Sequence, residues 1–110
     1  MLSTKDLVEL NRSFASGVVV NRGSLDYAVK TQARSKNWLR TAAVFTRTIL
    51  IDHVFEDGNK RTAAAVILML MEMHNIDYDP SALPKIILTI LKKNMINITN
   101  IERMIRDAIR

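Results

Sequence analysis

The residues best suited to chemistry lie in one segment, residues 53–62, whose sequence is HVFEDGNKRT. Within it a glycine precedes a strongly helical sequence, so the backbone N–H groups of Gly58, Asn59 and Lys60 are expected to be free donors at a helix N-terminus. The helix dipole favours an anion at this end, and Gly58 has no Cβ, so a phosphate can approach the backbone closely. Arg61 adds a guanidinium that can bind phosphate oxygens in a bidentate arrangement. The segment therefore predicts an anion site.

Two other side chains of this segment suit the transfer of a phosphate-containing group. The imidazole of His53 can take a proton from an attacking hydroxyl near neutral pH. The carboxylate of Asp57 is a hard oxygen ligand for Mg²⁺, which prefers one or two carboxylates together with substrate phosphates. The segment thus predicts phosphoryl or nucleotidyl transfer, in which the protein positions the reacting groups and stabilises charge. A surface histidine followed by a turn into a helix is the simpler alternative, but it does not account for Phe55 or Arg61.

The same segment resembles the signature of the Fic/Doc family, commonly written H-x-F-x-[DE]-G-N-[GK]-R. The matching positions are His53, Phe55, Asp57, Gly58, Asn59, Lys60 and Arg61. The resemblance implies a Fic fold in which His53 is the catalytic base for a target hydroxyl and Asp57 is the Mg²⁺ ligand. Phe55 would be a buried residue that holds the shape of the loop.

The remaining positions of the site also follow from this resemblance. Contacts to the phosphates of the nucleotide would come from Gly58, Asn59, Lys60 and Arg61. An extended segment near residues 18–23 would form a flap that docks an extended stretch of the protein target. Its residues are Val18, Val19, Val20, Asn21, Arg22 and Gly23.

Two positions bear on the subtype. AMP-transferring Fic enzymes usually have Gly where this chain has Lys60 and a second Arg where it has Ala64. With Lys60 at this position the chain instead resembles the Doc toxins, which transfer the terminal phosphate of a nucleotide to a translation factor. The resemblance therefore favours phosphorylation of a protein hydroxyl, with ATP or another nucleotide as co-substrate and Mg²⁺ as cofactor. AMP transfer and a non-catalytic Fic-fold binding module remain alternatives.

The inhibitory helix found in many Fic enzymes has no counterpart in this sequence. That helix carries the motif [S/T]-x-x-x-E-[GN], and the position four residues after Ser3, Thr4 or Thr99 is not Glu. If the protein is a toxin, its restraint would come from a separate antitoxin chain or from an oligomeric contact.

The elements that must position this segment are predicted to be helices. In the first half of the chain, Ser3 or Thr4 can cap a helix over residues 4–14, with apolar positions at helical spacing. Three valines at positions 18–20 and the turn-forming residues after them predict a short extended excursion. The helical pattern returns at Ser24.

In the second half, Asn37 can cap a helix that ends near Asp52, and residues 59–74 are almost entirely apolar, which predicts a helix buried centrally among others. Pro80 and Pro84 precede an amphipathic helix, and Thr99 or Asn100 can cap a final one. The prediction is an all-α, compact bundle of about six helices with a short extended flap.

Length and composition bound the function classes. A chain of 110 residues fits one domain, residues 1–110, and the absence of cysteine excludes disulfides, thiolate metal sites and a catalytic Cys. The longest apolar run, residues 63–71, is too short to cross a bilayer, so we expect a cytoplasmic protein with no membrane partner. The net charge of +5 is spread along the chain, which is more typical of a solvated surface than of a nucleic-acid groove. The local excess of basic residues is at Lys92, Lys93, Arg103, Arg106 and Arg110.

Overall fold

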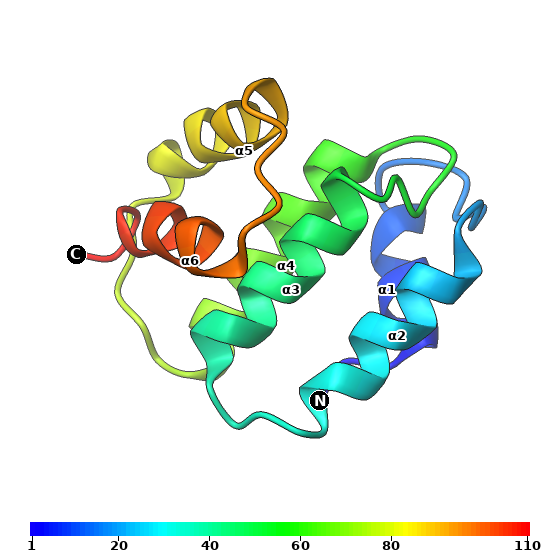
Figure 1. The fold of residues 1–110 in the computed structure, drawn as a ribbon, viewed down its shortest axis with the longest axis horizontal. Helices are drawn as coiled ribbons and strands as arrows, with labels where there is room; N and C mark the ends of the chain where they lie inside the picture. The colour runs from blue at the N-terminus through cyan, green and yellow to red at the C-terminus, as the bar shows by residue number, and fades with distance from the viewer.

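The computed structural model describes every residue of the chain, 1–110, and contains six α-helices (Figure 1). In chain order they are α1 (Thr4–Arg12), α2 (Arg22–Gln32), α3 (Trp38–Leu50), α4 (Asn59–Met73), α5 (Leu83–Lys92) and α6 (Ile98–Arg106). A short 3-10 helix, η1 (Pro80–Ala82), leads directly into α5. There is no β-strand, so the predicted all-α fold with about six helices is confirmed.

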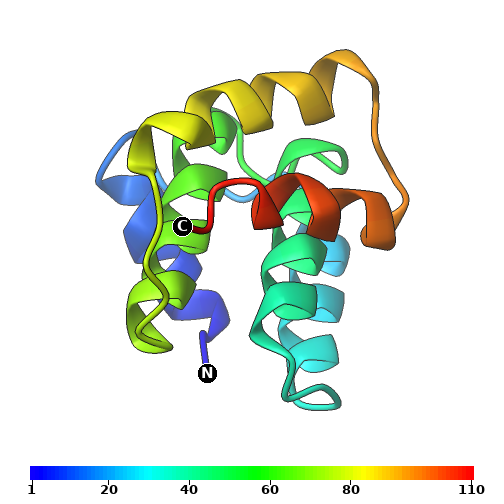
Figure 2. The same ribbon diagram turned by 90° about the vertical axis from the view of Figure 1, so that its left-hand side faces the viewer.

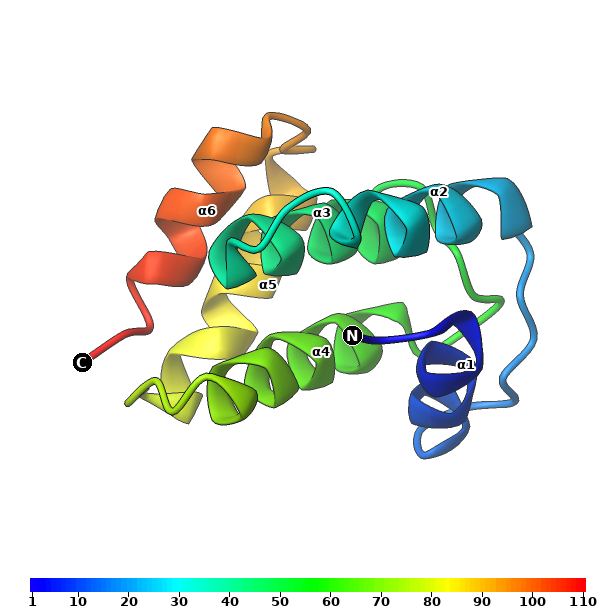
Figure 3. The ribbon, with the colours of Figure 1, turned by 90° about the horizontal axis from the view of Figure 1, so that it is seen from below.

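The centre of the molecule is the pair α3 and α4, which lie side by side and run in opposite directions (Figure 3). Helix α3 also contacts α2 and α6, and α4 also contacts α1 and α5. The helices α1 and α2 therefore lie on one side of the central pair and α5 and α6 on the other, with α5 crosswise to the pair (Figures 1 and 2). The Cα radius of gyration, 12.5 Å, is that of a compact chain of this length.

Burial follows the apolar pattern of the sequence. Large, fully buried side chains come from both central helices, among them Phe45 and Ile49 of α3 and Ile67 and Met71 of α4. They belong to one hydrophobic cluster to which all six helices contribute. None of the helices has the length and apolarity needed to cross a bilayer.

Polar side chains at the helix N-termini explain where most helices begin. Ser3 caps α1 and forms a reciprocal capping box with Asp6, and Asn37 caps α3 by accepting hydrogen bonds from two backbone N–H groups of its first turn. Both caps were predicted. The cap of α6 was predicted wrongly: Asn97, rather than Thr99 or Asn100, accepts from the Asn100 N–H at 3.0 Å. The earlier start brings Ile98 into the helix, where it packs against the core.

The region between α1 and α2 differs from the sequence prediction. Helix α1 ends at Arg12 rather than at residue 14, and α2 begins at Arg22, so Arg22 and Gly23 lie in a helix and not in the flap. The side chain of Asn21 accepts a hydrogen bond from the Ser24 N–H at 3.3 Å and so caps α2. The extended flap is therefore residues 18–21.

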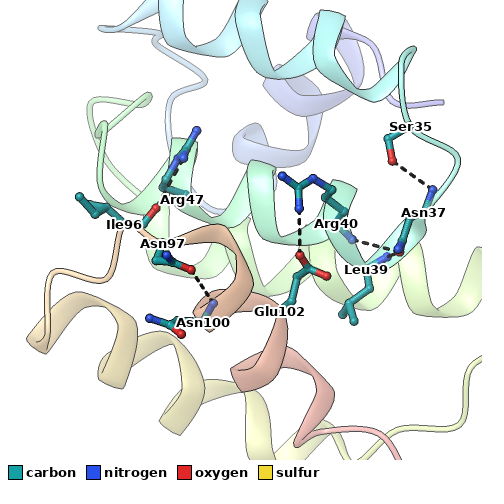
Figure 4. Close-up of polar contacts among 9 residues, drawn as sticks. All are labelled: Ser35, Asn37, Leu39, Arg40, Arg47, Ile96, Asn97, Asn100 and Glu102. Atoms are coloured by element: carbon teal, nitrogen blue, oxygen red, sulfur yellow. Dashed lines mark hydrogen bonds and ion pairs between the residues drawn. The ribbon is translucent and has the colours of Figure 1, made fainter.

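Polar contacts fix α6 against α3 (Figure 4). Nη1 of Arg40 lies 3.4 Å from Oε1 of Glu102, and Nη1 of Arg47 lies 3.5 Å from the carbonyl oxygen of Ile96, just before α6. The Glu102 side chain is only 14% exposed, so this ion pair is partly shielded from solvent. These contacts join α3 to α6 and to the residue that precedes the α6 cap (Figure 4).

Candidate active site

The loop between the two central helices carries the predicted chemistry. Residues 51–58 connect α3 to α4, and within them Val54 and Phe55 are fully buried while His53, Glu56 and Asp57 are exposed. The buried pair anchors the loop in the hydrophobic core, and the titratable side chains on both sides of it face solvent. Phe55 thus occupies the buried place that the resemblance implied.

A buried amide fixes the shape of this loop. The Asn59 side chain accepts a hydrogen bond from the Phe55 N–H at 3.0 Å and donates one to the Phe55 carbonyl at 2.8 Å. Its Nδ2 also lies 3.3 Å from Nδ1 of His53. Because the Asn59 side chain is committed to the loop, it is the backbone N–H of this residue that remains for an anion.

The N-terminus of α4 is open to an anion. Gly58 is its N-cap, in the left-handed conformation with φ of 76°, and no side chain caps the helix. The Gly58 N–H donates to Oδ1 of Asp57 at 2.8 Å, so the prediction that this donor is free was wrong. The backbone N–H groups of Asn59, Lys60 and Arg61 make no hydrogen bond within the chain, and these three are the free donors.

A pocket of about 410 Å³ lies over this helix end. Its lining residues are Phe14, His53, Glu56, Asp57, Gly58, Asn59, Lys60 and Arg61. The structure therefore gathers all the predicted catalytic, metal and phosphate residues around one cavity, of a size that accommodates a small-molecule ligand. Lys60 and Arg61 are exposed and form no ion pair, so their charges are available to a ligand.

His53 has an unusual backbone conformation. Its φ of 52° places a non-glycine residue in the left-handed region. Such conformations cost roughly 1–3 kcal/mol and persist where surrounding contacts impose them. Here the buried Val54 and Phe55 on one side and the end of α3 on the other determine the turn, and the imidazole projects to the pocket as a result.

The flap is paired with this loop along one edge. The N–H groups of Val20 and Asn21 donate to the Val54 carbonyl at 2.8 and 3.2 Å, and the Glu56 N–H donates to the Val18 carbonyl at 3.0 Å. The side chains of Val18 and Val20 are 45% and 56% exposed. The structure thus brings residues 18–21 next to the pocket and leaves two apolar side chains of the flap in solvent.

Two residues near the pocket were not predicted. Phe14 falls within the helix predicted over residues 4–14, but it follows the end of α1, is 40% exposed and lines the pocket. Asn11 is fully buried, and its side chain bonds to Asp57 of the loop, to Thr62 of α4 and to Gly17, the residue before the flap. A polar residue among the apolar positions of an amphipathic helix was the only signal for Asn11.

The acidic side chains near the pocket limit the kind of metal site that can form. No group of three or more His, Cys, Asp and Glu side chains is arranged to hold a metal ion. Asp57 uses Oδ1 for the Gly58 N–H and leaves Oδ2 without a hydrogen bond. This arrangement fits Mg²⁺ held by one carboxylate together with phosphate oxygens and water, rather than by the protein alone.

Comparison with models of known protein families, with curated proteins and with solved structures finds no match for this chain.

Proposed function

We propose that this chain is a Fic/Doc-type transferase that phosphorylates a hydroxyl of a protein target, with ATP or a similar nucleotide as the donor. The observation that carries this proposal is the common pocket of His53, Asp57 and the open N-terminus of α4. A proton acceptor, a carboxylate and an anion site around one cavity are the parts that phosphoryl transfer needs.

The anion site would bind the phosphates of the nucleotide. Three free backbone N–H groups and the helix dipole favour negative charge at this position. The guanidinium of Arg61 and the ammonium of Lys60 add charge-assisted hydrogen bonds, which contribute about 1.5–3 kcal/mol each. Gly58 permits close approach because it has no side chain.

Asp57 would hold Mg²⁺ through its free carboxylate oxygen. When bound together with the nucleotide, Mg²⁺ neutralises the negative charge on the phosphates. The hydrogen bond from the Gly58 N–H fixes the Asp57 carboxylate at the edge of the anion site, so little reorganisation is needed when the nucleotide arrives.

His53 would take the proton of the target hydroxyl at Nε2. The hydroxyl oxygen bonds to the γ-phosphorus, the bond from that phosphorus to the bridging oxygen breaks, and ADP leaves. Nδ2 of Asn59 is a donor, so its contact with Nδ1 favours the neutral tautomer with the proton on Nε2. To accept a proton at Nε2, the ring must instead carry its proton on Nδ1, and it then loses the long hydrogen bond from Asn59, worth about 0.5–1.5 kcal/mol. The exposed ring can turn at that cost.

The flap would bind the target. Its inner edge is paired with the loop, whereas the backbone N–H of Val19 on its other edge makes no hydrogen bond within the chain. An extended target segment can pair with this free edge and bring its hydroxyl to His53. By its resemblance to Doc, the target would be a cytoplasmic translation factor, and an antitoxin protein would restrain the activity.

Transfer of radiolabel from ATP to proteins of a cell lysate, in Mg²⁺, tests this function. The chain has only two histidines, so His53→Ala has a matched control in His74→Ala, at the C-cap of α4 and stacked on Trp38. We expect label from γ-labelled ATP, lost in His53→Ala and retained in His74→Ala. Label from α-labelled ATP would instead indicate AMP transfer, and no label from either donor would indicate a binding module.

A further inference from the structure

The most constrained polar side chain outside the motif is the carboxamide of Asn11, near the end of α1. It is fully buried, and all of its hydrogen-bonding partners lie outside α1. Nδ2 donates to the carbonyl of Asp57 at 2.9 Å and to Oγ1 of Thr62 at 3.0 Å, and Oδ1 accepts from the Gly17 N–H at 2.9 Å. A buried amide with this many bonds has one favourable orientation, because a flip would place Oδ1 against the Asp57 carbonyl.

These bonds join three segments that the proposed site requires to stay in register. Gly17 precedes the flap, Asp57 belongs to the loop, and Thr62 lies in the first turn of α4. The Asp57 carbonyl belongs to the peptide that also carries the Gly58 N–H. Through this peptide, the Asn11 side chain restrains both the Asp57 carboxylate and the start of the anion site.

The packing around Gly58 places the same side chain directly beneath the anion site. A Cβ added to Gly58 would meet Nδ2 of Asn11 at 3.1 Å and Cβ of Ala15 at 3.0 Å. The end of α1 therefore supports the left-handed turn from below, while Phe14 from the same turn of chain lines the pocket. A single side chain of α1 thus bonds to the residue before the flap, to the loop and to α4.

We propose that Asn11 is a positioning residue that holds the flap and the anion-binding loop together as one unit, so that Asp57 and the N–H groups of α4 keep the geometry that binds Mg·ATP. This role rests on the proposed function. Asn11 touches no reacting atom; it acts through the Asp57 peptide and the Gly17 N–H.

The test uses a second buried carboxamide as its control. Gln32 of α2 is also buried, and it bonds to the N–H and the carbonyl of Leu2, away from the pocket. We expect Asn11→Leu and Gln32→Leu both to lower the Tm. Only Asn11→Leu should raise the KM for Mg·ATP, by about tenfold or more, with Gln32→Leu within about twofold of the wild type. Equal KM values for the two variants would overturn the proposal.

A second variant tests the proposal if Asn11→Leu does not fold. Asn11→Asp keeps the acceptor for the Gly17 N–H and removes the donor to the Asp57 carbonyl. It should show the same rise in KM, and an unchanged KM would contradict the proposal.

Binding of inorganic pyrophosphate in Mg²⁺, followed by the backbone amide signals of Asn59–Arg61, separates this proposal from the proposed function. If the wild type transfers no label but binds pyrophosphate, about tenfold weaker binding by the Asn11 variants supports the positioning role, and equal binding overturns it. A wild type that neither transfers nor binds overturns both.

Discussion

Replacement of Gly58 by Ala tests the geometry at the start of α4. The residue has φ of 76°, where a Cβ costs about 1–2 kcal/mol. The new methyl would lie 3.0 Å from Cβ of Ala15 and 3.1 Å from Nδ2 of Asn11, and such overpacking adds about 1–3 kcal/mol. The lower entropy of the unfolded Ala chain offsets about 0.4–1 kcal/mol of this. The expected net loss of unfolding free energy is about 3 kcal/mol.

For a domain of this size, about 3 kcal/mol lowers the Tm by roughly 15 °C, measurable by circular dichroism. Gly23→Ala is the matched control: Gly23 lies in the first turn of α2, and nothing lies within 4 Å of an added Cβ. That variant should gain about 0.5–1 kcal/mol, because Ala is the better helix former. A Gly58→Ala protein as stable as Gly23→Ala would refute the left-handed turn and its contacts with α1.

Three further changes probe the site and the fold. Arg61→Ala removes an exposed side chain without an ion pair, so the unfolding free energy should stay within about 0.5 kcal/mol, while the KM for Mg·ATP should rise about tenfold or more. Phe55→Ala empties a fully buried position and should cost about 3–5 kcal/mol in urea unfolding. Hydrogen bonds from Ser3, chiefly from its backbone N–H, lower the pKa of Asp6 below 3.8. The stability that the ionised Asp6 carboxylate adds to the fold is therefore present above that pH and lost below it. The stability difference between wild type and Asp6→Asn, from unfolding curves at a series of pH values, should therefore shrink as the pH falls through this range.

The sequence was sufficient to predict the central helices, because their signals are local. Asn37 is a strong cap directly before an apolar periodic run, and in α4 a polar first turn is followed by a run that is apolar on every side. The start of α6 was ambiguous, since Asn97, Thr99 and Asn100 are all good caps within four positions. Which of them acts depends on where α6 packs against α3, and that is tertiary information.

In the site, too, the residues close together in the sequence were predictable and those brought in from distant segments were not. His53, Asp57 and Arg61 of one contiguous motif lie around one pocket, because a loop and the first turn of the next helix bring them together locally. Asn11 could not be predicted, since two of its hydrogen-bonding partners lie 46 and 51 positions along the chain. Similarly, the competition of the Asp57 side chain for the Gly58 N–H depends on a side-chain conformation that the residue pattern does not specify.

The most direct test of the central claim is a titration of the ¹⁵N-labelled protein with ATP in Mg²⁺, followed by backbone amide signals. The predicted result is saturable shifts that are largest at Asn59, Lys60 and Arg61 and that weaken in Arg61→Ala. Shifts confined to the basic residues of α5 and α6, or no saturable shift, would contradict the assignment of a nucleotide site at the N-terminus of α4.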